Sequence, residues 1–231
     1  MDNRFYFEDI HGSQISFLGQ EYNHITKVRR AKVGDYLVGF NGDGYDYHLK
    51  IREILKDRVI CEIIDRQKNK ASVDIEVTVY LAMIKHDALT DAIDFLTQMN
   101  VTHLKLFKAD NSIADIDTKK LEKLKNIVIQ ACKQSERASA MTIDIIQKSD
   151  ISHDILKYDN RYFAYEDATQ RIKSFSGDFA VIIGPEGGFS SEEVRYFSSF
   201  ATVVSLSKTI LRSPVACVSA VSALKAVNND C

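Results

Sequence analysis

The residues best suited to chemistry form two short segments near the C-terminal end of the chain. The first, Gly-Pro-Glu-Gly-Gly at residues 184–188, follows the apolar run 180–183. Its two adjacent glycines lack a Cβ atom, which lets the backbone approach a ligand closely. Ser190 with Glu193 three residues later has the capping-box pattern that begins a helix, where unpaired backbone N–H groups can bind a ligand. The segment therefore predicts a buried strand, a binding loop and a capped helix.

The second segment is Leu-Ser-Lys-Thr-Ile-Leu-Arg-Ser at residues 206–213. Ser213 is a favourable N-cap for a helix in which Pro214 occupies the first turn. That helix is rich in alanine and serine, so it can pack closely against neighbouring backbone. Two strand-to-helix junctions could thus present backbone groups to one ligand. Taken alone, the first segment is as often an ordinary turn as a binding loop, and the sequence has neither a dinucleotide fingerprint nor a Walker A loop.

The elements that must position these segments differ between two parts of the chain. Residues 1–70 contain short strands with frequent turns, which indicates a small β-barrel or sandwich with one helix near residues 20–28. The charged residues 65–72 are interpreted as a linker. Beyond them strands alternate with helices, which favours a largely parallel sheet. Strands are expected at 77–83, 104–107, 161–165, 179–183 and 202–206, and helices at 89–99, at 121–135, after 190 and after 213.

Composition and charge exclude several classes of protein. With 45% hydrophobic and 27% charged residues, the 231-residue chain is typical of a soluble globular protein. No segment resembles a signal peptide or a membrane span, so we expect a cytoplasmic protein without a membrane partner. The four cysteines have no C-x-x-C spacing and the six histidines are dispersed, which predicts reduced thiols and no metal site. A net charge of −2 argues against indiscriminate coating of nucleic acid, and the basic groups at 27–32 and 117–137 are candidates for either RNA contact or solvated faces.

Together the two C-terminal segments resemble the ribosomal small-subunit methyltransferase E family. The resemblance extends to Arg4-Phe5-Tyr6, to residues 24–35 and to Gln134-Ser135-x-Arg137, and so spans nearly the whole chain. Members are SPOUT-class enzymes that use S-adenosylmethionine to methylate N3 of one uridine in 16S rRNA. The resemblance implies an α/β fold, with a small PUA-like β-barrel RNA-binding domain over residues 1–70 and a SPOUT methyltransferase domain with a C-terminal trefoil knot over residues 71–231. It also implies a homodimer that acts on the small ribosomal subunit and not on DNA.

The same resemblance assigns roles to individual residues. The implied cofactor contacts, largely through backbone, are Gly184, Glu186 and Gly187 on one wall and Leu206, Ser207, Ile210 and Leu211 on the other. The implied catalytic cations, which would stabilise charge on the uracil oxygens, are Arg212 first and Arg137 second. The implied RNA contacts are Arg4, Arg30, Lys85 and Gln134. Each charged side chain also has a plain structural interpretation, such as a salt bridge for Arg212 or a loop brace for Glu186.

Some positions depart from the usual family pattern, among them Ser207, Phe95, Gln98, Asn100, Asn111 and Pro214. These departures bear on RNA contact and on the dimer face more than on the cofactor loops. Three functions stay open: methylation of uridine N3, ribose 2′-O-methylation by a related SPOUT enzyme, and RNA binding or ribosome assembly without catalysis. No residue stands out as the general base. Because N3 lies on the pairing edge of uracil, the target must be unpaired or extruded.

Overall fold

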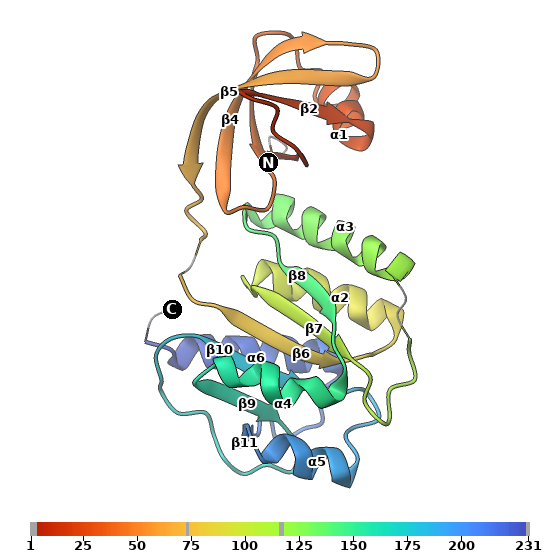
Figure 1. The fold of residues 1–231 in the computed structure, drawn as a ribbon, viewed down its shortest axis with the longest axis vertical. Coiled ribbons are helices and arrows are strands. Elements are labelled where there is room, and N and C mark those ends of the chain that lie inside the picture. The colour runs from red at the N-terminus through yellow and green to blue at the C-terminus, as the bar shows by residue number, and fades with distance from the viewer. Residues whose placement is uncertain (1–3, 73, 116–117, 230–231) are drawn as a thin grey trace. The chain divides into compact units, whose positions relative to one another are not determined.

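The computed structural model describes residues 4–72, 74–115 and 118–229 (Figure 1). The chain divides into two compact units, Met1–Ser72 with Ile129–Ala140, and Val73–Val128 with Met141–Cys231. The predicted domains 1–70 and 71–231 place residues 129–140 in the second domain, whereas the structure groups this segment with the first unit. Hydrogen bonds explain the grouping: the backbone N–H of Ala140 donates to the carbonyl of Gly42 at 3.2 Å, and that of Gly44 donates to Ala138 at 3.2 Å.

The first unit contains a curled, mostly antiparallel sheet. Its strands are β1 (Arg4–Tyr6), β2 (Gln14–Leu18), β3 (Tyr36–Phe40), β4 (Tyr45–Ile54) and β5 (Arg58–Lys68), in the order β1-β3-β4-β5-β2. Side chains alternate across β2, where Ile15 and Phe17 are buried, and these pack with Phe5 and Leu49 in one core. The predicted small β domain is therefore confirmed.

Two local predictions in this unit concern the charged residues 65–72 and the helix near 20–28. The supposed linker 65–72 is wrong, because β5 continues to Lys68, which pairs with Tyr45 of β4. The charged side chains of this segment are exposed. Strands pair through backbone hydrogen bonds, so the charge pattern did not indicate that this segment belongs to a strand. The helix expected near 20–28 is present as α1 (Gly19–Asn23) followed directly by a π-helical turn, η1 (His24–Val28).

The second unit contains a six-stranded sheet in which all neighbouring strands pair in parallel. Its strands are β6 (Val77–Ala82), β7 (His103–Phe107), β8 (Thr142–Ile145), β9 (Asn160–Ala164), β10 (Phe179–Ile183) and β11 (Thr202–Val204), in the order β11-β9-β10-β6-β7-β8. Every residue of β6 and β10 is buried, as expected for strands covered on both faces. The predicted α/β class is confirmed, and the short strand β8 is an element that the sequence did not indicate.

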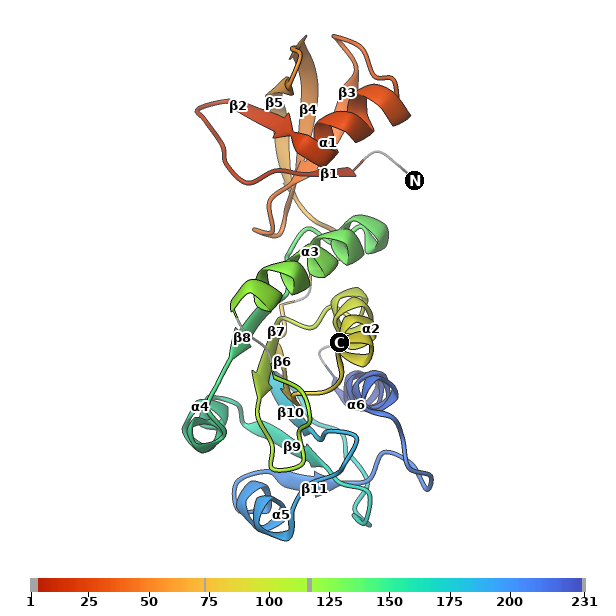
Figure 2. The ribbon, with the colours of Figure 1, turned by 90° about the vertical axis from the view of Figure 1, so that its right-hand side faces the viewer.

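Helices cover both faces of this sheet. The helices in this part of the chain are α2 (His86–Gln98), the short α4 (Ile151–Asp154) between 3₁₀ turns η2 (Lys148–Asp150) and η3 (Ile155–Lys157), α5 (Ser191–Ser198) and α6 (Ser213–Val227), and α3 (Thr118–Ser135) begins in the second unit and ends in the first. Helices α2 and α6 lie on one face and α4 and α5 on the other (Figure 2). None of the helices that the structure describes is long and apolar enough to cross a membrane. Because the strands are parallel, the loops after β9, β10 and β11 meet at one edge of the sheet, where α/β proteins commonly bind ligands.

Candidate active site

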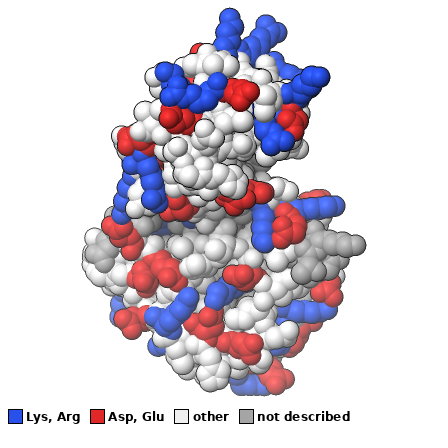
Figure 3. Space-filling model, turned by 45° about the horizontal axis from the view of Figure 1, so that its top comes forward, with Lys and Arg blue, Asp and Glu red and all other residues white. Residues whose placement is uncertain are grey.

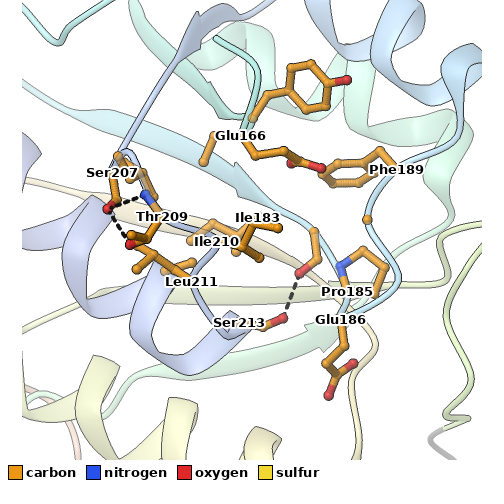
Figure 4. A pocket seen from close by; sticks show the side chains of 16 residues that line it. Glu166, Ile183, Pro185, Glu186, Phe189, Ser207, Thr209, Ile210, Leu211 and Ser213 are labelled. Carbon is orange, nitrogen blue, oxygen red and sulfur yellow. Dashed lines mark hydrogen bonds between the residues drawn. The ribbon is translucent and has the colours of Figure 1, made fainter.

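A cleft opens at the carboxyl ends of three neighbouring strands in the second unit (Figure 4). The loops after β10 and β11 form two walls, and the loop after β9 forms a third that the sequence did not indicate. The lining residues are Ala164, Tyr165 and Glu166 at the end of β9 and beyond it, Ile183, Gly184, Pro185, Glu186, Gly188 and Phe189 at the end of β10 and beyond it, Leu206, Ser207, Thr209, Ile210 and Leu211 after β11, and Ser213 and Ala216 in α6.

The structure brings together most of the residues predicted to contact a cofactor. Those that line the cleft are Gly184, Glu186, Leu206, Ser207, Ile210 and Leu211. Gly187 is not among the lining residues. Its carbonyl instead accepts a hydrogen bond from Asn111 Nδ2 at 3.1 Å. The ligand-binding role of this set remains a proposal.

The glycine-rich loop is held in shape by packing within the protein. A Cβ atom at Gly184 would lie 2.7 Å from the ring of Phe189, and one at Gly187 would lie 3.1 Å from Asn111 Cβ. Gly188 has φ of +68°, a conformation that favours glycine. Asn111 Nδ2 also donates to the carbonyl of Gly188 at 3.1 Å. The loop after β7 therefore supports the loop after β10.

The capping box predicted after the glycine loop is present. Ser190 Oγ accepts the backbone N–H of Glu193 at 3.2 Å, and Glu193 Oε2 accepts that of Ser190 at 3.0 Å. The second oxygen of Glu193, almost fully buried, accepts hydrogen bonds from Lys148 Nζ at 2.9 Å and from the backbone N–H of Asp110 at 2.8 Å. The carboxyl group of Asp110 accepts from Lys148 at 2.5 Å and from Ser190 Oγ at 2.6 Å. These bonds to Lys148 and Ser190 lower the pKa of Asp110.

The two predicted binding segments are joined directly. Ser213 Oγ donates to the carbonyl oxygen of Gly184 at 3.0 Å. The N-cap of α6 is Arg212, so the prediction that Ser213 caps this helix is wrong by one position. The hydroxyl is used in a tertiary contact instead of a local cap. Ser207 Oγ accepts the backbone N–H of Thr209 at 3.1 Å and shapes the turn that presents Ile210, whose side chain is 90% exposed.

The predicted catalytic arginines have different surroundings. Arg212 is exposed and lies between two residues that line the cleft, although it is not itself among them. Arg137 belongs to the first unit, is 4% exposed, and donates from Nε to Ser139 Oγ at 3.2 Å. Burial lowers the pKa of Arg137. The catalytic role implied for Arg137 stays a prediction.

The predicted RNA contacts also divide. Arg4 forms an ion pair with Asp46 at 2.5 Å and lies 4.9 Å from the ring centre of Phe40, so its guanidinium braces the first unit. Arg30 is exposed with φ of +55°, and Gln134 is exposed. Lys85 is the exposed N-cap of α2, and its backbone N–H donates to Glu186 Oε1 at 3.4 Å.

The remaining expectations concern metals and thiols. Among the described residues no group of three or more His, Cys, Asp and Glu could hold a metal ion. Cys61, Cys132 and Cys217 are buried and form no disulfide, and Cys231 lies outside the described part of the chain. Residues 117 to 119 of the basic segment 117–137 likewise have no described side chains.

The fold and the cleft define a class of protein. Residues 71–225 match the model of the RNA methyltransferase domain, and residues 17–64 match that of the RNA methyltransferase PUA domain. Ribosomal RNA small subunit methyltransferase E of Rickettsia conorii is 30% identical over 243 residues, which cover 99% of this chain and 97% of that protein. The Aquifex aeolicus protein of the same name is 31% identical over 95% of this chain and 97% of its own length. The chain therefore belongs to the ribosomal RNA small subunit methyltransferase E family.

Solved structures support the same fold. A methyltransferase from Legionella pneumophila, in complex with bound S-adenosylmethionine, matches with a TM-score of 0.84 at 24% identity and covers 98% of both chains. A ribosomal RNA small subunit methyltransferase E from Neisseria gonorrhoeae, bound to S-adenosyl methionine, matches with a TM-score of 0.83 at 21% identity and covers 97% of both chains. At these identities the likeness establishes the architecture.

Proposed function

We propose that this chain transfers a methyl group from S-adenosylmethionine to N3 of a specific uridine in the 16S rRNA of the small ribosomal subunit. The observation that carries the proposal is the cleft formed by the loops after β10 and β11, joined by the bond from Ser213 to Gly184. Its support is membership of a family named for methylation of small-subunit rRNA, together with two similar structures that hold S-adenosylmethionine.

The cleft suits this cofactor on physical grounds. Its walls combine backbone groups with apolar side chains, which can accommodate the ribose and the flat adenine. Ile210 exposes nearly all of its side chain at the cleft, and covering an isoleucine with an aromatic ring is favourable by roughly 1.5–3 kcal/mol when burial is complete. Gly184, Glu186, Leu206, Ser207, Ile210 and Leu211 would hold the cofactor.

When bound, S-adenosylmethionine supplies a methyl group attached to a positively charged sulfur. The protein must orient uracil N3 toward that methyl and favour the form of uracil that has lost its N3 proton. Arg212 is exposed beside the cleft, so its fixed positive charge can stabilise the negative charge that develops on the uracil oxygens. Arg137, buried in the first unit, stays the second candidate for this role.

The decisive experiment maps modified nucleosides in 16S rRNA by mass spectrometry, from cells with and without this protein. Loss of one N3-methyluridine is the expected result. Ribose methylation would instead leave an alkali-resistant phosphodiester bond, and an unchanged rRNA would point to a binding protein without catalysis.

In vitro, Arg212→Ala should lower the methylation rate by roughly 100-fold or more while the calorimetric affinity for S-adenosylmethionine stays unchanged. A wild-type rate in this variant overturns the assignment of Arg212.

RNA contact is proposed for an exposed surface of the first unit that bears both cations and an aromatic ring. Lys and Arg side chains project from this unit with acidic groups between them (Figure 3). Arg30 lies close in sequence to Tyr36, which is 59% exposed and has Lys50 Nζ 5.5 Å from its ring centre. Cations bind phosphates and an exposed aromatic ring can stack on an unpaired base.

Tyr36→Ala should raise KM for RNA and leave S-adenosylmethionine affinity unchanged. Equal KM values for both proteins would exclude Tyr36 from the RNA-contacting set.

Lys85 and Gln134 remain proposed RNA contacts on the strength of their exposure. We also propose the trefoil knot, the homodimer and a cytoplasmic location, all of which rest on the family resemblance. Light scattering coupled to size-exclusion chromatography measures the dimer directly. A mass near 26.1 kDa, that of one chain, would contradict it.

A further inference from the structure

The loop after β9 places one carboxylate over the cleft. Glu166 lines the cleft and is exposed, and its Oε1 lies 3.5 Å from the position that a Cβ on Gly188 would occupy. In Figure 4 its side chain extends from the end of β9 toward Phe189, across the cleft from Ile210. Among the described residues, Glu166 has no hydrogen-bond or ion-pair partner. The carboxylate is therefore available to a ligand in the cleft.

The rest of the lining does not neutralise this charge. Glu166 and Glu186 are the charged members of the described lining, which contains no lysine or arginine. The carboxyl group of Glu186 accepts the backbone N–H of Lys85 at 3.4 Å, and in Figure 4 it points away from Ile210 and the rest of the cleft. Glu166 thus gives the cleft a local negative potential that attracts positive charge.

Charge is what distinguishes the two ligands that this cleft would hold in turn. S-adenosylmethionine has a sulfonium, an ammonium and a carboxylate, and its net charge is positive. In methyl transfer N3, which has already lost its proton, bonds to the methyl carbon, the carbon–sulfur bond breaks and its electron pair stays on sulfur. The product, S-adenosylhomocysteine, has a neutral thioether and no net charge. Donor and product share every other group, so hydrogen bonds to the ribose, the adenine or the amino acid cannot separate them.

We propose that Glu166 makes the cleft selective by charge, favouring the positively charged methyl donor over its uncharged product, so that the donor competes more effectively than the product for the cleft. This inference depends on the proposed function, because it assumes that the cleft holds S-adenosylmethionine. The loop after β9 would then discriminate between the two ligands. The loops after β10 and β11 would bind the chemical groups that donor and product share.

Titration calorimetry with S-adenosylmethionine and S-adenosylhomocysteine tests the proposal. In Glu166→Gln the Kd for the donor should rise about two- to five-fold, the range for an exposed charge interaction, with the Kd for the product unchanged. Raising the salt concentration should weaken donor binding in the wild type and have a smaller effect in the variant. The matched control is Asp167→Asn, which removes the same charge from the next residue. Asp167 accepts from Tyr165 Oη at 3.2 Å and is not part of the cleft lining, so the ratio of the two Kd values should stay at its wild-type value.

Three results overturn the inference, and they differ from one another. An unchanged ratio in Glu166→Gln shows that the carboxylate does not sense the sulfonium. An equal rise in both Kd values shows that Glu166 contacts a group common to donor and product. If the wild-type chain binds neither ligand, the proposed function fails and this inference fails with it. Because the replaced side chain is exposed, Glu166→Gln should melt at the same temperature as the wild type. Such a result excludes misfolding as the cause of any change in Kd.

Discussion

Gly184→Ala should destabilise the protein through contact with one specific ring. A Cβ atom at residue 184 would lie 2.7, 3.1 and 3.2 Å from three atoms of Phe189. Ordinary contact begins at 3.4 Å, so the ring would have to withdraw by about 0.7 Å. It cannot do so freely, because Phe189 packs edge-on against Phe163 and Phe197 at centroid distances of 5.1 and 5.2 Å. Crowding of this kind costs about 1–3 kcal/mol.

The assay is chemical denaturation of four proteins: wild type, Gly184→Ala, Phe189→Leu and the double variant. Leucine at 189 removes the ring atoms that the new Cβ would meet, so the alanine should be better tolerated in that background. We expect a coupling free energy of about 0.5–3 kcal/mol between the two positions. Strictly additive losses would show that the ring does not resist the substitution, and the explanation of Gly184 by packing would be wrong. Because Phe189 lines the cleft, Gly184→Ala should also weaken S-adenosylmethionine binding, and Phe189→Leu should restore part of it.

Three further predictions concern other parts of the second unit and the buried thiols. Asn111→Ala removes both hydrogen bonds to the loop after β10 and should lower the free energy of unfolding by about 1–2 kcal/mol. Calorimetry should also show a lower affinity for S-adenosylmethionine, and unchanged binding would mean that the loop needs no such support. The pKa of Asp110 is lowered by its bonds to Lys148 and Ser190, so its carboxylate stabilises the folded chain at neutral pH and that contribution is lost as pH falls below about 4. Denaturation should therefore show a larger loss for Asp110→Asn at pH 7 than at pH 3, and equal losses would refute the linkage. Burial raises the pKa of Cys61 and of Cys217 to about 12, so iodoacetamide should label them at pH 8 only after unfolding.

The sequence was most informative where structure depends on near neighbours. The capping box of Ser190 and Glu193 is formed by residues three positions apart, and the structure has both of its hydrogen bonds. The buried strand β10 is apolar throughout, and β6 is apolar apart from the hydroxyl groups of Thr78 and Tyr80, so the burial of both strands follows largely from composition. Prediction failed where a distant partner decides the outcome. Ser213 has the residue type of a cap but bonds to Gly184, which is 29 positions away. The loop after β9 could be placed at the cleft only once the strand order was known, because β9 lies between β10 and β11 in space and precedes both in sequence.

The glycines of the loop after β10 are also required by packing and backbone conformation within the protein, which the sequence alone did not indicate. The sequence suggested that a missing Cβ lets a ligand approach the backbone. In the structure Gly187 does not line the cleft, and the space beside it is filled by Asn111 at 3.1 Å. Gly184 is crowded by Phe189, and Gly188 requires a left-handed backbone conformation. Contacts within the protein therefore account for all three glycines, while close approach of a ligand to Gly184 and Gly188 stays a prediction. It follows that a larger side chain at 187 should act on binding through the position of Asn111 and its loop. Gly187→Ala and Asn111→Ala should then impair cofactor binding in a non-additive way, whereas direct contact of Gly187 with the ligand predicts independent effects.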